Sequence, residues 1–287
     1  GEFPEGEEAA LEDEIADLMA SGDTAAATRK QLFLEQFRGI RGFDKPKRDY
    51  NAVELTTQKR FSRNFFMQGS YTYSRVTGNF PGLFSADNGQ VDPNITSQYD
   101  LIELLANRDG PLPQDRPHYF KLDAYYIWKL DDWFGGNGLG EVTTGGRFRA
   151  LSGTVQDALA RHYLYGFDES FLLPRGEMGR NDVAWGFDSK IAYGRDIGHG
   201  MKLEFWTDLY SVEYLFQTEH VAAVDETYTL DNANPVVGGE YSDLIWAKQQ
   251  DTGGIETSEP VARNRNFQNV SARYNPFYVQ LGARLSF

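Results

Sequence analysis

FYVQLGARLSF, residues 277–287, alternates apolar and polar side chains from one end to the other. Its apolar set consists of Phe277, Val279, Leu281, Ala283, Leu285 and Phe287. Successive side chains of a β-strand point to opposite faces, so a strict two-residue period predicts a strand with one apolar and one polar face. This segment is the clearest strand in the chain.

Six earlier segments repeat the two-residue period. They cover residues 50–61, 65–74, 120–130, 142–150, 185–194 and 201–210. Before residue 50 the spacing of apolar residues is helical instead. An acidic segment, 5–20, has its apolar residues at Leu11, Ile15, Leu18 and Met19. A second segment, 24–37, has them at Leu32, Phe33 and Phe37. The chain is therefore predicted to have a helical part, 1–49, followed by a part built of seven strands, 50–287.

The connections between these strands alternate between short and long. The short ones are residues 62–64, 131–139 and 196–200, and the long ones are 77–116, 152–182 and 211–275. Loops beyond about 12–15 residues are uncommon in compact soluble domains. Outer-membrane β-barrels combine short periplasmic turns with long extracellular loops. This alternation predicts an all-β transmembrane barrel with a periplasmic C-terminus, in which residues 1–49 belong to an extracellular loop.

Composition allows this fold and excludes several others. The net charge of -14 argues against a nucleic-acid partner, and the absence of cysteine rules out disulfides and thiolate metal sites. No apolar run is long enough for a transmembrane helix. Aromatic residues make up 14% of the chain, which fits interfacial girdles but also fits an aromatic-rich soluble β-domain.

Aromatic residues fall at both ends of the apolar face in several strands. Their spacing corresponds to roughly 20–25 Å along a tilted strand, the height of the apolar band of a membrane barrel. We therefore expect lipid contact at Phe65, Tyr73, Phe120, Trp128, Trp185, Tyr193, Phe277 and Phe287. Charge on the opposite face requires water or a polar lumen, and we expect the lumen to be lined by Lys121, Asp123, Arg147, Arg149, Asp188, Lys190, Glu204, Asp208 and Arg284.

Seven strands do not close a bacterial barrel, because single-chain barrels have an even number of strands, from about 8 upward. Either one strand escapes the pattern, or the seven belong to a larger barrel. The number of strands is odd, and both the first and the last run towards the periplasm. The first strand therefore needs a preceding outward strand as its partner, which favours the larger barrel.

Several stretches resemble the C-terminal region of TonB-dependent receptors, in particular the Oar-like branch. The resemblance covers most of the chain from Arg48 onward, whereas the helical segment 5–37 resembles no known motif. FLLPRG and NPVVGG point to the Oar-like branch, whereas the QGSYTYSR-like and DRPH-like pieces recur widely across such receptors and alone indicate only the superfamily. The resembling stretches are RDYNAVELTTQKRFSRNFFMQGSYTYSR (48–75), DRPHYFKLDAYY (115–126), FRALSGT (148–154), HYLYG (162–166), FLLPRGEMGR (171–180), NPVVGGEY (234–241) and YVQLGARLSF (278–287).

The resemblance implies a barrel of about 22 strands, of which these are the last seven, and an N-terminal plug domain upstream. It also implies partners: the lipid bilayer with its lipopolysaccharide, the TonB–ExbB–ExbD motor through the missing N-terminal part, and an extracellular ligand. The terminal Phe287 resembles the signal read by the barrel assembly machinery.

Few residues suggest a chemical site. His118, His162, His199 and His220 lack metal-site spacing and are expected to be surface or loop residues. Residues 87–94, DNGQVDPN, gather oxygen ligands around a glycine; an Asx-rich turn explains them, with calcium binding in an outer loop as the alternative. No other cofactor is expected.

The two arginines of the strand 142–150 have two possible roles. Arg147 and Arg149 either face an anionic ligand or pair with Asp188 and Glu204 across the lumen, and pairing is favoured. Gly198 and Gly200 around His199 are explained by a hairpin turn.

Three functions are compatible with these observations. The favoured one is an active-transport receptor of the outer membrane. A binding or adhesion protein without energised transport is the alternative. An outer-membrane hydrolase comes third, because no nucleophile–base set or phosphate-binding loop is visible, so no enzymatic activity is expected.

Overall fold

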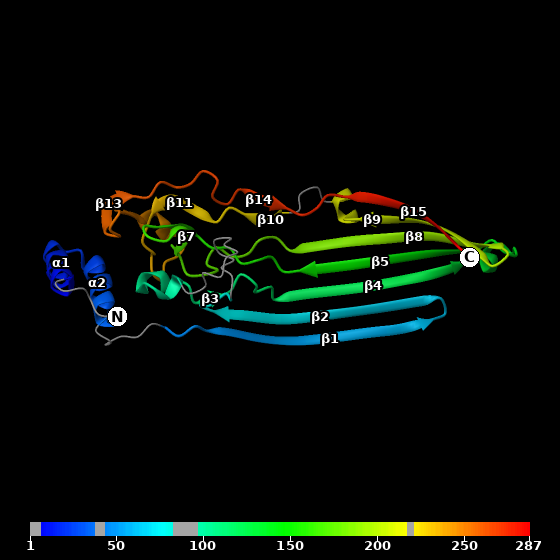
Figure 1. Cartoon of the computed structure of the whole chain (residues 1–287), viewed down its shortest axis with the longest axis horizontal. Helices are drawn as coiled ribbons and strands as arrows, with labels where there is room; N and C mark the ends of the chain where they lie inside the picture. The colour runs from blue at the N-terminus through cyan, green and yellow to red at the C-terminus, as the bar shows by residue number, and fades with distance from the viewer. Residues whose placement is uncertain (1–6, 38–43, 83–96, 217–220) are drawn as a thin grey trace.

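The computed structural model describes residues 7–37, 44–82, 97–216 and 221–287, and an antiparallel sheet of seven long strands dominates it (Figure 1). The strands are neighbours in the order β1-β2-β4-β5-β8-β9-β15. All seven predicted strands are confirmed, with ends shifted by a few residues. Their bounds are β1 (Arg48–Ser62), β2 (Phe65–Gly78), β4 (His118–Lys129), β5 (Glu141–Leu151), β8 (Ala184–Gly198), β9 (Met201–Tyr210) and β15 (Tyr278–Ser286).

The register of the sheet separates the two predicted faces cleanly. Residues directly opposite each other in neighbouring antiparallel strands project to the same face. Tyr71 lies opposite Phe120, and Phe120 lies opposite Ala150. On the other face, Arg147 lies opposite both Asp123 and Asp188. Every expected lipid-facing residue within a strand therefore shares one face of the sheet, and every expected lumen-facing residue shares the other.

Short and long connections lie at opposite ends of the sheet, called here the turn end and the loop end (Figure 1). At the turn end, Gly198, His199 and Gly200 have φ values of 89°, 58° and 78°, and β8 and β9 pair directly next to them. The expected hairpin is confirmed. The link between β4 and β5, expected as a plain turn, contains a short helix, α3 (Leu130–Phe134).

The long connections are not irregular, although the sequence suggested no strands in them. They pack together at the loop end into a cap, defined as residues 97–117, 152–183, 211–216 and 221–277. Short strands form three small sheets there, β11-β6-β7, β10-β14 and β12-β13. The cap elements are η1 (Ser97–Tyr99), η2 (Ile102–Leu105), β3 (Gly110–Pro111), β6 (Leu159–His162), β7 (Gly166–Phe171), η3 (Val212–Leu215), β10 (Val221–Val224), β11 (Thr227–Asn232), η4 (Tyr241–Trp246), β12 (Lys248–Gln250), β13 (Glu256–Pro260) and β14 (Val270–Arg273).

The cap has a hydrophobic core, unlike the sheet. Leu172 and Ala233 are fully buried in it, and the rings of Tyr228 and Phe267 meet edge to face. The rest of the core comprises Ala158, Ala160, Leu173, Leu244 and Ala247. Burial of apolar surface against water stabilises a unit of this kind, so the cap is folded by the forces that fold a soluble domain.

Two helices precede the sheet, α1 (Glu7–Ser21) and α2 (Thr24–Phe37), as predicted. They pack through Ile15, Ala27 and Leu34, with Leu11 and Leu18 against them. Met19, expected on the packed side, is 51% exposed because it lies in the last turn of α1, next to the connection to α2. The side chains of Leu32, Phe33 and Phe37 lie outside the described part. None of the helices in the described ranges is long and apolar enough to cross a bilayer.

A buried carboxylate joins the cap to the sheet. Asp115 has no exposed surface and accepts a hydrogen bond of 2.6 Å from the backbone N–H of Val76 in β2. Its other oxygen pairs with Arg180 and, at 3.3 Å, with Arg75. Paired in this way, a buried charge is tolerated and holds three segments in a fixed geometry.

Candidate ligand-binding site

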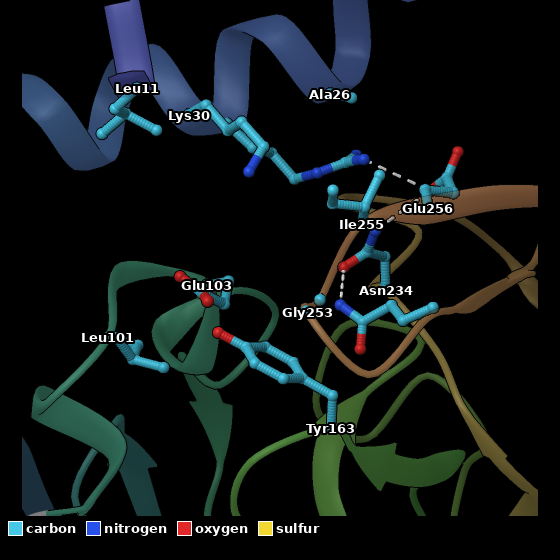
Figure 2. Close-up of a pocket in the computed structure, with 13 residues that line it drawn as sticks. Leu11, Ala26, Lys30, Leu101, Glu103, Tyr163, Asn234, Gly253, Ile255 and Glu256 are labelled. Carbon is cyan, nitrogen blue, oxygen red and sulfur yellow. Dashed lines mark hydrogen bonds and ion pairs between the residues drawn. The ribbon is translucent and has the colours of Figure 1, made fainter. Parts of the chain in front are cut away.

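A cavity of about 240 Å³ lies where the two N-terminal helices meet the cap (Figure 2). Leu11 and Lys30 face it from the helices, with Glu103 and Tyr163 on the cap side. Segments from four separate parts of the chain meet here. The lining residues are Leu11, Ala26, Arg29, Lys30, Leu101, Glu103, Tyr163, Asn234, Gln250, Gly253, Gly254, Ile255 and Glu256.

The basic groups of the cavity are each matched by an acid. The Arg29 guanidinium lies 3.3 Å from the carboxylate of Glu256, so an ion pair closes one side of the cavity. Lys30 pairs with Glu14 of α1 at 3.0 Å. Neither basic side chain therefore offers an uncompensated positive charge to an anionic ligand.

Glu103 faces the cavity from the opposite side, with His162 behind it. Burial raises the pKa of Glu103, and the positive charges of Lys30 and Arg29 partly oppose that rise. Burial, helped by the charge of Arg108, lowers the pKa of His162 to about 4. His162 is thus neutral at pH 7.

The backbone fixes which ring nitrogen of His162 carries the proton. Nδ1 accepts hydrogen bonds from the N–H groups of Leu164 and Tyr165, at 3.2 and 3.3 Å. The proton of the neutral ring therefore sits on Nε2. Nε2 lies 3.9 Å from Glu103 Oε1, too far for a hydrogen bond, and finds no hydrogen-bond partner among the described residues.

Two amide side chains complete the polar lining. The amide of Gln250 donates to Asn234 Oδ1, and the amide of Asn234 donates to Glu256 at 3.2 Å. Oε1 of Gln250 is buried and accepts no hydrogen bond within the described ranges. Gly254 has φ 80°, and a Cβ there would lie 2.5 Å from the ring of Tyr163, so only glycine allows the ring to line the cavity.

The polar face of the sheet forms ion pairs between neighbouring strands. Arg147 and Arg149 both pair with Asp123 of β4, at 3.3 and 2.8 Å. The expectation that they pair with Asp188 and Glu204 is wrong. Asp188 instead accepts from the backbone N–H of Ser211, and Glu204 pairs with Arg284 across β9 and β15. Adjacent strands bring side chains close enough to pair, whereas Glu204 is two strands away from β5.

The same face carries aromatic rings that the sequence analysis did not assign to a site. Phe61 and Phe66 both stack on Tyr125, at 5.8 and 5.2 Å between ring centroids. Tyr210 stacks on Tyr278 at 4.5 Å. A hollow of about 310 Å³ lies among these rings and charges, lined also by Lys190 and Asp208, which form an ion pair of 3.5 Å.

The expected lipid-facing residues stay a prediction, but their placement is clear. Phe65, Tyr73, Phe120, Trp128, Trp185 and Tyr193 share the face opposite the ion pairs. Phe277 and Phe287 flank β15 rather than belonging to it, and Phe287 is 97% exposed.

The remaining sequence candidates are not brought together. His118 accepts or donates a 2.7 Å hydrogen bond with the Tyr71 hydroxyl, and His199 sits in the β8–β9 turn. His162 is buried, contrary to the expectation of a surface residue. His220 and the calcium candidate 87–94 lie outside the described residues. Within them, no group of three or more His, Asp or Glu side chains is placed to hold a metal.

Sequence reasoning did not identify the cavity. Its residues follow no period, and Arg29 and Glu256 are 227 positions apart. A signal existed in two of the family-like stretches, because HYLYG contains Tyr163 and NPVVGGEY begins at Asn234. NPVVGG narrowed the resemblance to the Oar-like branch, but neither stretch revealed that Tyr163 and Asn234 line the same cavity.

Comparison with known proteins agrees with this architecture. Residues 8–149 match a family model described as an outer membrane beta barrel domain. The chain is 35% identical over 256 residues to the TonB-dependent transporter Oar of Myxococcus xanthus, covering 85% of this chain and 23% of that protein. The chain thus spans about a quarter of the length of this curated relative, and no solved structure matches it. The chain is an outer-membrane β-barrel segment that belongs with the TonB-dependent transporters of the Oar type.

Proposed function

We propose that this chain forms the last seven strands and the outer cap of a TonB-dependent receptor, in a barrel of about 22 strands. The unpaired edges of the sheet carry this proposal. Within the described residues, β1 and β15 each pair on one side only. In hydrocarbon every unpaired backbone group costs several kcal/mol, so strands from elsewhere in the receptor must complete the ring.

The orientation follows from the two ends of the sheet. Outer-membrane barrels place short turns in the periplasm and long loops outside. The turn end then faces the periplasm together with the C-terminus, and the cap with α1 and α2 faces the exterior. The cavity between the helices and the cap then lies on the exterior side of the membrane.

The cavity favours a small uncharged ligand that bears hydroxyl groups. Arg29 is compensated by Glu256 and Lys30 by Glu14, so the lining offers no free positive charge to an anion. Burial raises the pKa of Glu103 and so weakens its attraction for a cation. Tyr163, Asn234 and Gln250 provide donors and acceptors at its wall, and Leu11, Leu101 and Ile255 provide apolar contact. A neutral sugar ring combines these two kinds of surface.

Energised transport is the second half of the proposal. The polar face of the sheet lines a lumen that a plug domain occupies, and the TonB–ExbB–ExbD motor acts on that plug. The relative's identity as a TonB-dependent transporter supports this half. A pull-down of the full-length receptor with the periplasmic domain of TonB tests it. Absence of binding overturns energised transport and favours the adhesion alternative.

Titration calorimetry on the detergent-solubilised full-length receptor tests the ligand class. N-acetylglucosamine, glucosamine and glucuronate share a ring but are neutral, cationic and anionic at pH 7. We expect only the neutral ring to bind. Gly253→Trp, which fills the cavity, should abolish binding, and Thr252→Trp, one position away and outside the lining, should not. Equal binding of a charged ring, or no binding of the neutral one, rejects this ligand class and leaves the TonB test to judge transport.

A further inference from the structure

Two large aromatic side chains are exposed at the turn end of the sheet. Trp133 is 65% exposed and Phe134 is 76% exposed, and both lie on α3. The helix has no buried residue. Aromatic side chains contribute large apolar surfaces that normally find a partner, so their exposure on this short helix calls for one.

The link that carries these side chains is held firmly. The Asp131 carboxylate accepts hydrogen bonds from the N–H groups of Gly138 and Leu139, at 3.1 and 2.8 Å. The hydroxyl of Tyr193 in β8 donates to the carbonyl of Leu139 at 2.8 Å. Gly135 ends the helix in the left-handed conformation. The two aromatic side chains are therefore presented by a fixed turn.

The exposed pair continues a row of rings on the sheet. Ring centroids are 6.5 Å apart between Phe65 and Tyr126, 4.5 Å between Tyr126 and Trp128, and 5.7 Å between Trp128 and Trp133. The first three residues lie on the face expected to contact lipid. The row runs from that face directly onto α3, so the surface around Trp133 extends the membrane-facing wall.

We infer that α3 is an interfacial anchor that inserts Trp133 and Phe134 into the membrane leaflet at the turn end. An amphipathic indole prefers the boundary between headgroups and acyl chains. Asp131 and Asp132 lie in the first turn of the same helix and line a polar hollow together with Glu141 and Lys202. The anchor fixes the depth of the β4–β5 link, and hence of the sheet, in the bilayer. This role is independent of ligand capture and of transport.

Tryptophan quenching on the full-length receptor in phosphatidylcholine vesicles tests the anchor. The contribution of Trp133 is the difference between the wild type and Trp133→Phe. Trp246 on η4 of the cap is 69% exposed and serves as the matched control through Trp246→Phe. Vesicles carry lipid brominated either near the headgroup or deep in the acyl chain, and iodide probes access from water.

Lipid brominated near the headgroup should quench Trp133 more than deeply brominated lipid, and neither should quench Trp246. Shielding of Trp133 from iodide without quenching by either lipid means that a protein covers it and overturns the anchor. Quenching by iodide alone overturns it as well. The substitution to Phe is mild, and heat-dependent mobility on a gel verifies that each variant is folded.

Discussion

The sheet exposes its apolar side chains, whereas the cap buries them. In the sheet, Leu55 and Leu281 are 65% and 75% exposed, and the strands enclose no core. In the cap, Leu172 and Phe171 are 0% and 1% exposed. The cap buries its apolar side chains in a core of its own, whereas those of the sheet are left for a second layer, which we expect to be lipid. The difference teaches that one chain can combine a water-soluble kind of core with a wall that has none.

Charges follow the same division. On the sheet, Arg284 pairs with Glu204 while its side chain remains 63% exposed. In the cap, Arg108 pairs with Glu169 at 2.7 Å, with side chains 1% and 7% exposed. Arg108 and Arg175 also lie over the ring of Phe171, at 4.7 and 4.4 Å. Ion pairs are thus accessory on the sheet and structural in the cap.

The largest effect should come from Arg108→Ala. Removing one partner of a buried ion pair costs about 3–5 kcal/mol. We expect the cap to unfold at lower denaturant while the sheet stays inserted, because the two units depend on different solvents. Limited proteolysis of the receptor in vesicles measures this as early cleavage within residues 97–117 or 152–183. Simultaneous loss of the sheet would contradict the separation.

A charge on the lipid-facing side should come next. Leu281→Arg places a cation in the apolar band, at a cost of about 2–4 kcal/mol near the bilayer midplane. Gln280→Arg is the matched control, because Gln280 lies on the other face, opposite Asp208. Insertion yield into vesicles should fall for the first variant and stay near wild type for the second. Equal yields would mean that the two faces are assigned wrongly.

Acid should weaken the cap through His162. Its pKa is about 4 in the folded chain and about 6.5 when unfolded, so only the unfolded state gains the proton between these values. Stability is therefore complete above pH 6.5 and falls as the pH drops towards 4, by about 2 kcal/mol at pH 5. Denaturant midpoints of the cap at several pH values measure this slope. His162→Gln should flatten it, and an unchanged slope assigns the effect to other groups.

The smallest effect should come from Arg284→Ala. An exposed ion pair contributes within about 1 kcal/mol, so the midpoint of unfolding should hardly move. The unfolding midpoint of Arg108→Ala, measured in the same way, then compares the stability lost with a buried ion pair to that lost with an exposed one. A loss as large as that of Arg108→Ala would show that the polar face of the sheet is dry in the complete barrel.

The local sequence pattern was sufficient to predict the sheet. Alternation such as that of Leu281, Ala283 and Leu285 is a local pattern, and the pleat of a strand converts it directly into two faces. The short turns make β1 pair with β2, β4 with β5 and β8 with β9, and the helical period placed α1 and α2. The DRPH stretch was visible as a motif, but the contacts by which Asp115 joins the cap to β2 were not.

The cap and the cavity, in contrast, become visible only in the folded chain. His162 meets Glu103 and Arg29 meets Glu256 only because long connections fold back on one another. The choice of Asp123 as partner of Arg147 and Arg149 also depends on which strands are adjacent and how long the side chains are. Contacts between residues far apart in sequence carry no period, because they are selected by shape and charge among many segments at once.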